Sequence, residues 1–160
     1  MILFFLKYLH ASLTAANAVP AFRLRIQEGE IYEYDQIHAS PTIVRPDGTF
    51  GFSYMDFHPK FERFQAEARK AIEVVQAEQG LLPAVSGEAV IHYSSLPWLR
   101  FTALSHARSF SFPDSAPKIS FGKVVQENGR RTMPMSVHVH HGLADGSHVG
   151  AYVEKLEAIL

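Results

Sequence analysis

The stretch MPMSVHVHHGLADGSHV, residues 133–149, holds the side chains best suited to chemistry. It contains two adjacent histidines, and Asp145 follows the second of them, His141, by four residues. Neutral imidazole is the most common general base near neutral pH, and a carboxylate that begins a helix is stabilised by the exposed N–H groups there. We therefore expect His141 to accept a proton, and Asp145 to brace the tight turn at Gly142 and begin the last helix.

The strand before His141 should determine where its ring points, because successive side chains of a strand alternate between two faces. Met135, Val137 and Val139 form an apolar face, and the alternation adds His141 to it. The opposite face carries the polar residues Ser136, His138 and His140. We expect His141 on the core side at the end of the strand, with its ring held by packing and one nitrogen facing a pocket.

Three helices are predicted around this segment. An N-terminal helix has leucines at positions 3, 6, 9 and 13 on one face and ends near Asn17. A second helix begins at Pro59 and ends before Gly80. The last helix begins near Ser147, and its apolar face consists of Val149, Val153, Leu156 and Leu160.

Short strands are predicted at residues 22–27, 89–94, 119–126 and 133–140. In the first strand Arg23 and Arg25 alternate with apolar residues, which puts both arginines on the solvent side. Asn128-Gly129 is a strong hairpin signal and joins the last two strands. Few helices and hairpin-joined strands indicate an α+β fold, a two-layer sandwich in which helices cover one face of a mixed β-sheet.

Composition narrows the class of protein. The 160 residues carry 15 Lys and Arg against 16 Asp and Glu, so the net charge of −1 argues against a polybasic nucleic-acid binder. With 47% hydrophobic residues a single folded domain is expected, and the absence of cysteine excludes disulfides and thiolate nucleophiles. Lys7 interrupts the apolar N-terminus, so we expect a helix there rather than a signal peptide, and a soluble, cytoplasmic protein that does not bind membranes.

Several segments resemble one enzyme family. HHGLADG matches the HHxxxDG signature of the CoA-dependent acyltransferases, and SSLPWLRFT resembles the Ser-x-x-Pro-Trp segment of the chloramphenicol acetyltransferases. APKISFGKVVQENGRRTMPMSVHVHH resembles the hairpin that follows in that family, and FRLRI and HASPTIVRPDGTFGFSY also look like it. The resemblance covers essentially the whole chain and implies the α+β fold of that family.

The resemblance also implies roles for individual residues. His141 would be the general base that takes a proton from a substrate hydroxyl as it attacks acetyl-CoA, without an acyl-enzyme. Ser94 would donate a hydrogen bond to the oxyanion, and Asp145 would order the active-site loop. Ser120 stands where the family usually has a threonine that holds a water, and Phe52 falls at an aromatic position of the chloramphenicol pocket.

The resemblance further implies partners and a length. Family members act on chloramphenicol and acetyl-CoA, use no metal, confer antibiotic resistance, and form homotrimers whose active sites lie between subunits, with His141 facing the neighbour. Their chains begin several tens of residues earlier, and that stretch supplies an arginine for the aspartate of the motif. We therefore expect an N-terminally truncated domain over residues 1–160 with weak or absent activity, in which Arg100, Arg130 or Arg131 would have to replace that partner.

Four alternatives stay open. The acceptor could be another small alcohol, or the chain could be a lipoamide-type transacylase core, although that family has Arg after its catalytic histidine where this chain has Gly142. The chain could also be a catalytically silent fragment that trimerises or binds a ligand. A zinc site would use His138 and His140 with His106 or His148, but no acidic ligand is spaced with them.

Overall fold

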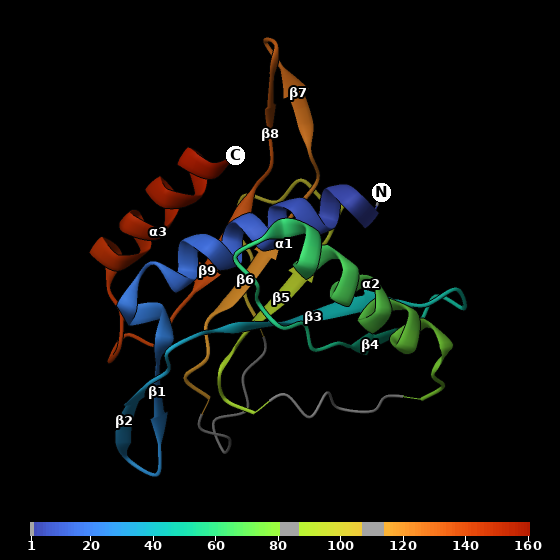
Figure 1. Cartoon of the computed structure of the whole chain (residues 1–160). Helices are drawn as coiled ribbons and strands as arrows, with labels where there is room; N and C mark the ends of the chain where they lie inside the picture. Colours follow the sequence, from blue (N-terminus) through green and yellow to red (C-terminus); the bar gives the residue numbers. More distant parts are fainter. Residues whose placement is uncertain (1, 81–86, 107–113) are drawn as a thin grey trace.

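A computed structural model describes residues 2–80, 87–106 and 114–160 of the chain, and Figure 1 shows how its elements are arranged. The helices are α1 (Ile2–Asn17), the short 3-10 helix η1 (Pro20–Arg23), α2 (Phe61–Ala77) and α3 (Gly146–Ile159). The strands are β1 (Leu24–Gln27), β2 (Glu30–Glu33), β3 (His38–Val44), β4 (Phe50–Phe52), β5 (Val90–Ser95), β6 (Lys118–Phe121), β7 (Val125–Glu127), β8 (Arg130–Thr132) and β9 (Met135–His138).

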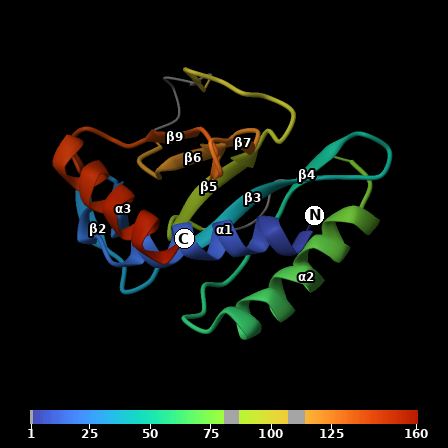
Figure 2. The ribbon, with the colours of Figure 1, turned by 90° about the horizontal axis from the view of Figure 1, so that it is seen from above.

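The main sheet has five strands in the order β4-β3-β5-β6-β9. Its three central strands, β3, β5 and β6, are parallel, and the edge strands β4 and β9 pair with them in the antiparallel sense. Figure 2 shows that α1, α2 and α3 all lie on the same side of this sheet. The prediction of a mixed sheet with helices on one face is therefore confirmed.

Helix α1 belongs to the hydrophobic core. Leu6, Leu9 and Leu13 are fully buried, as the leucine spacing predicted. Leu3 is 42% exposed because the first turn of α1 projects beyond the residues that cover the rest of the helix, so the prediction is wrong for that position. None of the helices within residues 2–80, 87–106 and 114–160 combines the length and the apolar character needed to cross a membrane.

A chain of buried hydroxyl groups links two helices to the sheet. Ser12 Oγ in α1 lies 2.8 Å from Tyr93 OH in β5 and 2.7 Å from Tyr152 OH in α3. Burial raises the pKa of both tyrosines, so both rings stay neutral. Tyr152 is fully buried whereas Leu160 is 74% exposed, so the apolar face predicted for the last helix is wrong at its C-terminal end.

Arg25 is fully buried, which contradicts its predicted place on the solvent side. The alternation argument assumed that Phe22 starts the strand, but η1 extends to Arg23 and β1 begins only at Leu24. The Arg25 guanidinium turns inward instead and donates hydrogen bonds to four carbonyl oxygens, those of Phe22, Leu24, Glu88 and Val90. Burial lowers the pKa of Arg25 to about 10, which still leaves the side chain charged at neutral pH.

The predicted hairpin at Asn128-Gly129 is confirmed. Both residues have positive φ, 51° and 78°, as a type I′ turn requires. Beyond the hairpin, β6 and β9 pair with Phe121 opposite Met135, whereas Val125 is opposite Thr132. Three residues lie between Phe121 and Val125, but only two lie between Thr132 and Met135 on the opposite strand. The ladder therefore carries an extra residue near Gly122 and splits into two shorter strand pairs.

Gly122 cannot carry a side chain without disturbing this break in the ladder. A Cβ at this position would lie 2.6 Å from Pro134 Cγ and 2.8 Å from the backbone oxygen of Leu99. Since a backbone oxygen cannot rotate away, we expect Gly122→Ala to lower the free energy of unfolding by about 1–3 kcal/mol in urea denaturation. Gly150→Ala is the matched control, because a Cβ inside α3 meets open space there and alanine should stabilise the helix by about 0.5–1 kcal/mol. Equal losses in both variants would contradict this account.

Candidate functional site

Two of the predicted site residues lie side by side on the face of the sheet that the helices leave uncovered. Ser94 in β5 is paired with Ser120 in β6, and Ser120 is paired with Ser136 in β9. Residues paired in register point to the same face of a sheet. Tyr93 points toward α1, where it contacts Ser12, so its neighbour Ser94 must point the other way. The three serines therefore form a row of hydroxyl groups on the helix-free face.

Phe52 extends this row at the far edge of the sheet. It is paired with Thr42 of β3, and it is 37% exposed. Pro41 is paired with Tyr93, and continuing that register by one residue places Thr42 beside Ser94. The predicted substrate-lining aromatic and the two predicted hydroxyl groups are thus brought to one face of one sheet.

The hydroxyl groups of Ser94 and Ser120 have different surroundings. Ser120 is fully buried, and its Oγ lies 3.2 Å from His106 Nε2. Ser94 is half-buried, and its hydroxyl makes no hydrogen bond to any side chain or backbone group in the described part of the chain. A half-buried hydroxyl that is not engaged elsewhere can donate to a substrate oxygen, which is the role predicted for Ser94.

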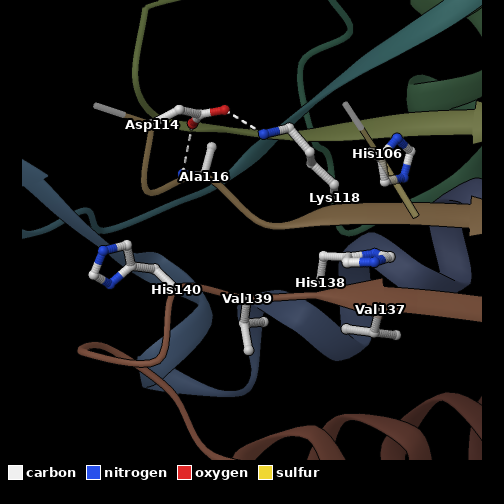
Figure 3. A pocket seen from close by; sticks show the side chains of 8 residues that line it. All are labelled: His106, Asp114, Ala116, Lys118, Val137, His138, Val139 and His140. Atoms are coloured by element: carbon white, nitrogen blue, oxygen red, sulfur yellow. Dashed lines mark hydrogen bonds and ion pairs between the residues drawn. The ribbon is translucent and has the colours of Figure 1, made fainter. Parts of the chain in front are cut away.

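A cavity of about 300 Å³ opens beside this row of serines. Figure 3 shows its lining residues: His106, Asp114, Ala116, Lys118, Val137, His138, Val139 and His140. His138 projects from β9 toward the strand that carries Lys118, whereas Val137 and Val139 project to the opposite side of β9. The Lys118 ammonium donates to the Asp114 carboxylate, so these two charges are paired with each other at the cavity wall.

His141 is exposed, which contradicts the prediction that it lies on the core side. Strand β9 ends at His138 rather than at residue 140, and a turn begins at His141, so the strand alternation does not reach this residue. His141 Nδ1 lies 3.4 Å from the carbonyl oxygen of Ala144. Because a carbonyl oxygen only accepts, this contact is a hydrogen bond when Nδ1 carries the hydrogen, which leaves Nε2 of this exposed residue free to accept one.

Asp145 is the N-cap of α3, as predicted. Its Oδ1 accepts hydrogen bonds from Ser147 Oγ at 2.6 Å and from Ser147 N at 2.9 Å. His148 Nδ1 accepts the backbone N–H of Asp145 at 3.1 Å and lies 2.9 Å from the same Oδ1. The hydrogen bonds from the Ser147 side chain and backbone lower the pKa of Asp145 to about 2, so the carboxylate is ionised at neutral pH. The cap fixes the end of the turn that carries His141.

No arginine pairs with Asp145 within the described residues, as expected for a chain without the family's N-terminal stretch. Among those residues the side chain of Asp145 contacts His148 at 2.9 Å, and Arg100 pairs instead with Glu127 at 2.8 Å. Arg130 and Arg131 lie in β8 and are exposed. None of these three arginines therefore takes the place of the family's partner for Asp145 in this structure, and Ser147 and the backbone N–H groups of the first helical turn satisfy the carboxylate instead.

The zinc alternative receives no support from the placement of its ligands. His148 Nδ1 is turned toward Asp145, and His140 Nδ1 accepts the backbone N–H of Gly142. Over residues 2–80, 87–106 and 114–160, no three potential ligands converge. His106 and His138 do lie close, with ring centroids 5.0 Å apart in an edge-to-face arrangement, but this is an aromatic contact.

The structure does not bring His141 to the serine row of its own chain. Lys118 at the start of β6 is paired with His138 at the end of β9. Because these strands are antiparallel, the chain leaving His138 moves away from Ser120 and Ser94. The base predicted from the motif and the hydroxyl groups predicted from the strands thus lie toward opposite ends of the sheet in one subunit.

Sequence reasoning assigned no role in the site to His106 beyond a possible metal ligand. It lies outside every strand and helix, so no periodicity places it near Ser120. Burial lowers the pKa of His106, and the nearby His138 and Lys118 lower it further, so its ring is neutral at neutral pH. Only the folded course of the chain shows that this imidazole reaches the row of serines.

Comparisons with known proteins agree on one family. The family model for chloramphenicol acetyltransferase matches residues 2–157. A chloramphenicol acetyltransferase from Bacillus pumilus is 30% identical over 148 residues, which are 91% of this chain and 67% of the relative. One from Escherichia coli is 27% identical over 157 residues, 96% of this chain and 71% of the relative.

Solved structures give the same result. A chloramphenicol acetyltransferase structure matches with a TM-score of 0.89 at 31% identity, covering 98% of this chain and 77% of that chain. A probable dihydrolipoamide acetyltransferase from Listeria monocytogenes matches with a TM-score of 0.70 at 13% identity, which shows a shared fold alone. Since the family model spans nearly the whole sequence and both relatives and structures agree with it, this chain belongs to the chloramphenicol acetyltransferase family.

Proposed function

We propose that this acyltransferase moves the acetyl group of acetyl-CoA to a primary hydroxyl group of chloramphenicol. The observation that carries the proposal is the placement of His141, an exposed histidine whose Nδ1 lies 3.4 Å from the Ala144 carbonyl oxygen. Nε2 takes the proton of the substrate hydroxyl as its oxygen attacks the thioester carbonyl. The new C–O bond forms, the C–S bond breaks, and the imidazolium returns the proton to the departing CoA thiolate.

Ser94 is proposed as the donor to the oxyanion of this reaction. Its half-buried hydroxyl lies on the helix-free face and has no partner within the described residues. A donor already in place before the negative charge develops lowers the barrier, because no groups have to reorganise at that moment. Ser120 and Phe52 are proposed to line the substrate site, and Asp145 to hold the turn of the base.

We further propose that the active site lies between subunits of a homotrimer. His141 and Ser94 lie toward opposite ends of the sheet in one chain, so a base and an oxyanion donor meet only if His141 of one subunit approaches the helix-free face of the next. Closed cyclic assemblies provide such a repeated, head-to-tail contact. The exposure of His141 and of Phe52 supports this arrangement.

The biological setting follows from the substrates. Acetyl-CoA as donor fits a cytoplasmic enzyme, and acetylation of an antibiotic hydroxyl fits a resistance function. We propose that residues 1–160 act as a single domain in this role, since the family model matches residues 2–157.

The test is a thiol-release assay with purified protein, acetyl-CoA and chloramphenicol. We expect thiol release that requires chloramphenicol, an acetyl ester on the primary hydroxyl of the product, and a loss of about 10²–10³-fold in turnover for Ser94→Ala. A panel of small alcohols and dihydrolipoamide serves as the comparison. Preferential acetylation of one of these would contradict chloramphenicol as the acceptor, and no thiol release with any acceptor would contradict the proposed function.

A further inference from the structure

We propose that His106 is a positioning residue that orients the Ser120 hydroxyl within the acetyl-transfer site. The inference deepens the proposed function and rests on it. It concerns a histidine outside the HHxxxDG segment, on a part of the chain that the main helices and strands do not include.

The buried hydroxyl of Ser120 needs a hydrogen-bond partner within the protein. Its side chain is fully buried, and His106 Nε2 at 3.2 Å is the hydrogen-bond partner of its hydroxyl in the described part of the chain. Serine has no branch at Cβ, so its χ1 angle and its hydroxyl hydrogen are restrained less than those of a β-branched side chain. A hydrogen bond to a fixed ring removes that freedom. It also fixes the direction in which the Ser120 oxygen can make a second hydrogen bond.

The His106 ring is itself held in place by its neighbours. His138 packs against it edge to face with ring centroids 5.0 Å apart, and His138 Nδ1 lies 3.1 Å from Ser136 Oγ. Four polar side chains thus run from β9 back to β6, beginning at Ser136 and ending at Ser120, which are paired in the sheet. The chain of contacts ties the Ser120 hydroxyl to two adjacent strands.

The surroundings of the His106 ring determine its charge. The ionisable groups that line the cavity with His106 are His138, His140, Lys118 and Asp114, and the last two form an ion pair with each other. Burial, His138 and Lys118 all disfavour protonation of His106 and lower its pKa, so the ring is neutral when the enzyme works near neutral pH. A neutral imidazole can orient a hydroxyl group without adding a second cation beside Lys118.

The activity test uses three variants of the whole chain in the thiol-release assay. His106→Leu should lower turnover roughly tenfold, because small errors of orientation are costly in rate, while leaving the KM for acetyl-CoA unchanged. His106→Gln should keep most of the rate, because its amide can reach the Ser120 hydroxyl. Adding Ser120→Thr to His106→Leu should restore part of the rate, because the branched side chain restrains its own χ1 angle.

A direct measurement keeps the inference testable if His106→Leu fails to fold. In NMR spectra of histidine ring nitrogens, Ser120→Ala should move the His106 signals and leave those of His58, which contacts Glu67, in place. Unmoved His106 signals, or wild-type turnover in His106→Leu, would contradict the positioning role alone. A wild-type chain that releases no thiol would contradict the proposed function together with this inference, so the two failures are distinguishable.

Discussion

Replacing His141 with alanine should lower the turnover number for acetyl transfer by about 10²–10⁴-fold, the usual contribution of a general base. The ring is exposed and contacts the chain mainly through Nδ1 and the Ala144 carbonyl, so the free energy of unfolding should stay close to that of the wild type. The measurement is steady-state thiol release, with urea denaturation on the same samples. A wild-type rate in His141→Ala would show that another group removes the proton.

His58→Gln is the matched control for this loss. His58 is a histidine of similar chemistry that contacts Glu67 of α2, on the helical side of the molecule, and its replacement should leave turnover unchanged. A mixture provides the second arm. His141→Ala and Ser94→Ala chains, unfolded together and refolded, should regain activity that neither has alone, because some interfaces then pair an intact His141 with an intact Ser94. Mixed, assembled chains without regained activity would contradict a site shared between subunits.

Replacing Arg25 with leucine should lower the free energy of unfolding by about 3–5 kcal/mol, the largest loss of stability expected in this chain. Leucine fills much of the volume but donates nothing, so the carbonyl oxygens of Leu24, Glu88 and Val90 lose their hydrogen bonds at 2.6, 2.8 and 2.6 Å. A buried acceptor without a donor bears its full desolvation cost. The result is measured as the urea midpoint and slope of the unfolding transition.

Two further variants separate this account from a simple loss of charge. Arg25→Lys keeps the charge, but a lysine ammonium lacks the planar guanidinium that reaches all four carbonyl groups. The free energy of unfolding of this variant should therefore stay clearly below that of the wild type. Arg63→Leu removes an exposed arginine that contacts Glu67 at 3.4 Å, and it should change stability little. An Arg25→Leu variant as stable as Arg63→Leu would mean that the four carbonyl groups find other donors.

Local patterns predicted much of the fold. The helix lengths follow from the spacing of apolar residues, and the turn at Asn128-Gly129 follows from the preference of those residues for positive φ. Asp145 was predicted as a helix cap because a cap depends only on the next few residues. Ser94 and Ser120 were found through their resemblance to a family, and the parallel pairing of β5 and β6 explains why they are neighbours.

Three of the wrong predictions share one physical cause, contacts between residues far apart in the sequence. Arg25 is buried because the carbonyl groups at Glu88 and Val90 need donors, and no local pattern contains that need. Tyr152 replaces Leu160 in the core because Ser12, 140 residues away, offers its hydroxyl. The exposure of His141 could not be read from alternation, since the strand ends where its partner β6 begins.

The buried hydroxyl chain of Ser12, Tyr93 and Tyr152 connects the segments that carry two of the proposed site residues. Tyr93 directly precedes Ser94, and Tyr152 lies in the helix that begins directly after the turn of His141. In the proposed trimer, His141 of a subunit contributes to one active site and Ser94 of the same subunit contributes to another. The three hydroxyl groups then fix the relative positions of the two residues within each subunit. A chimera that takes α1 or α3 from a relative would therefore have to keep these three hydroxyl groups, because losing one of them would displace residues of two active sites.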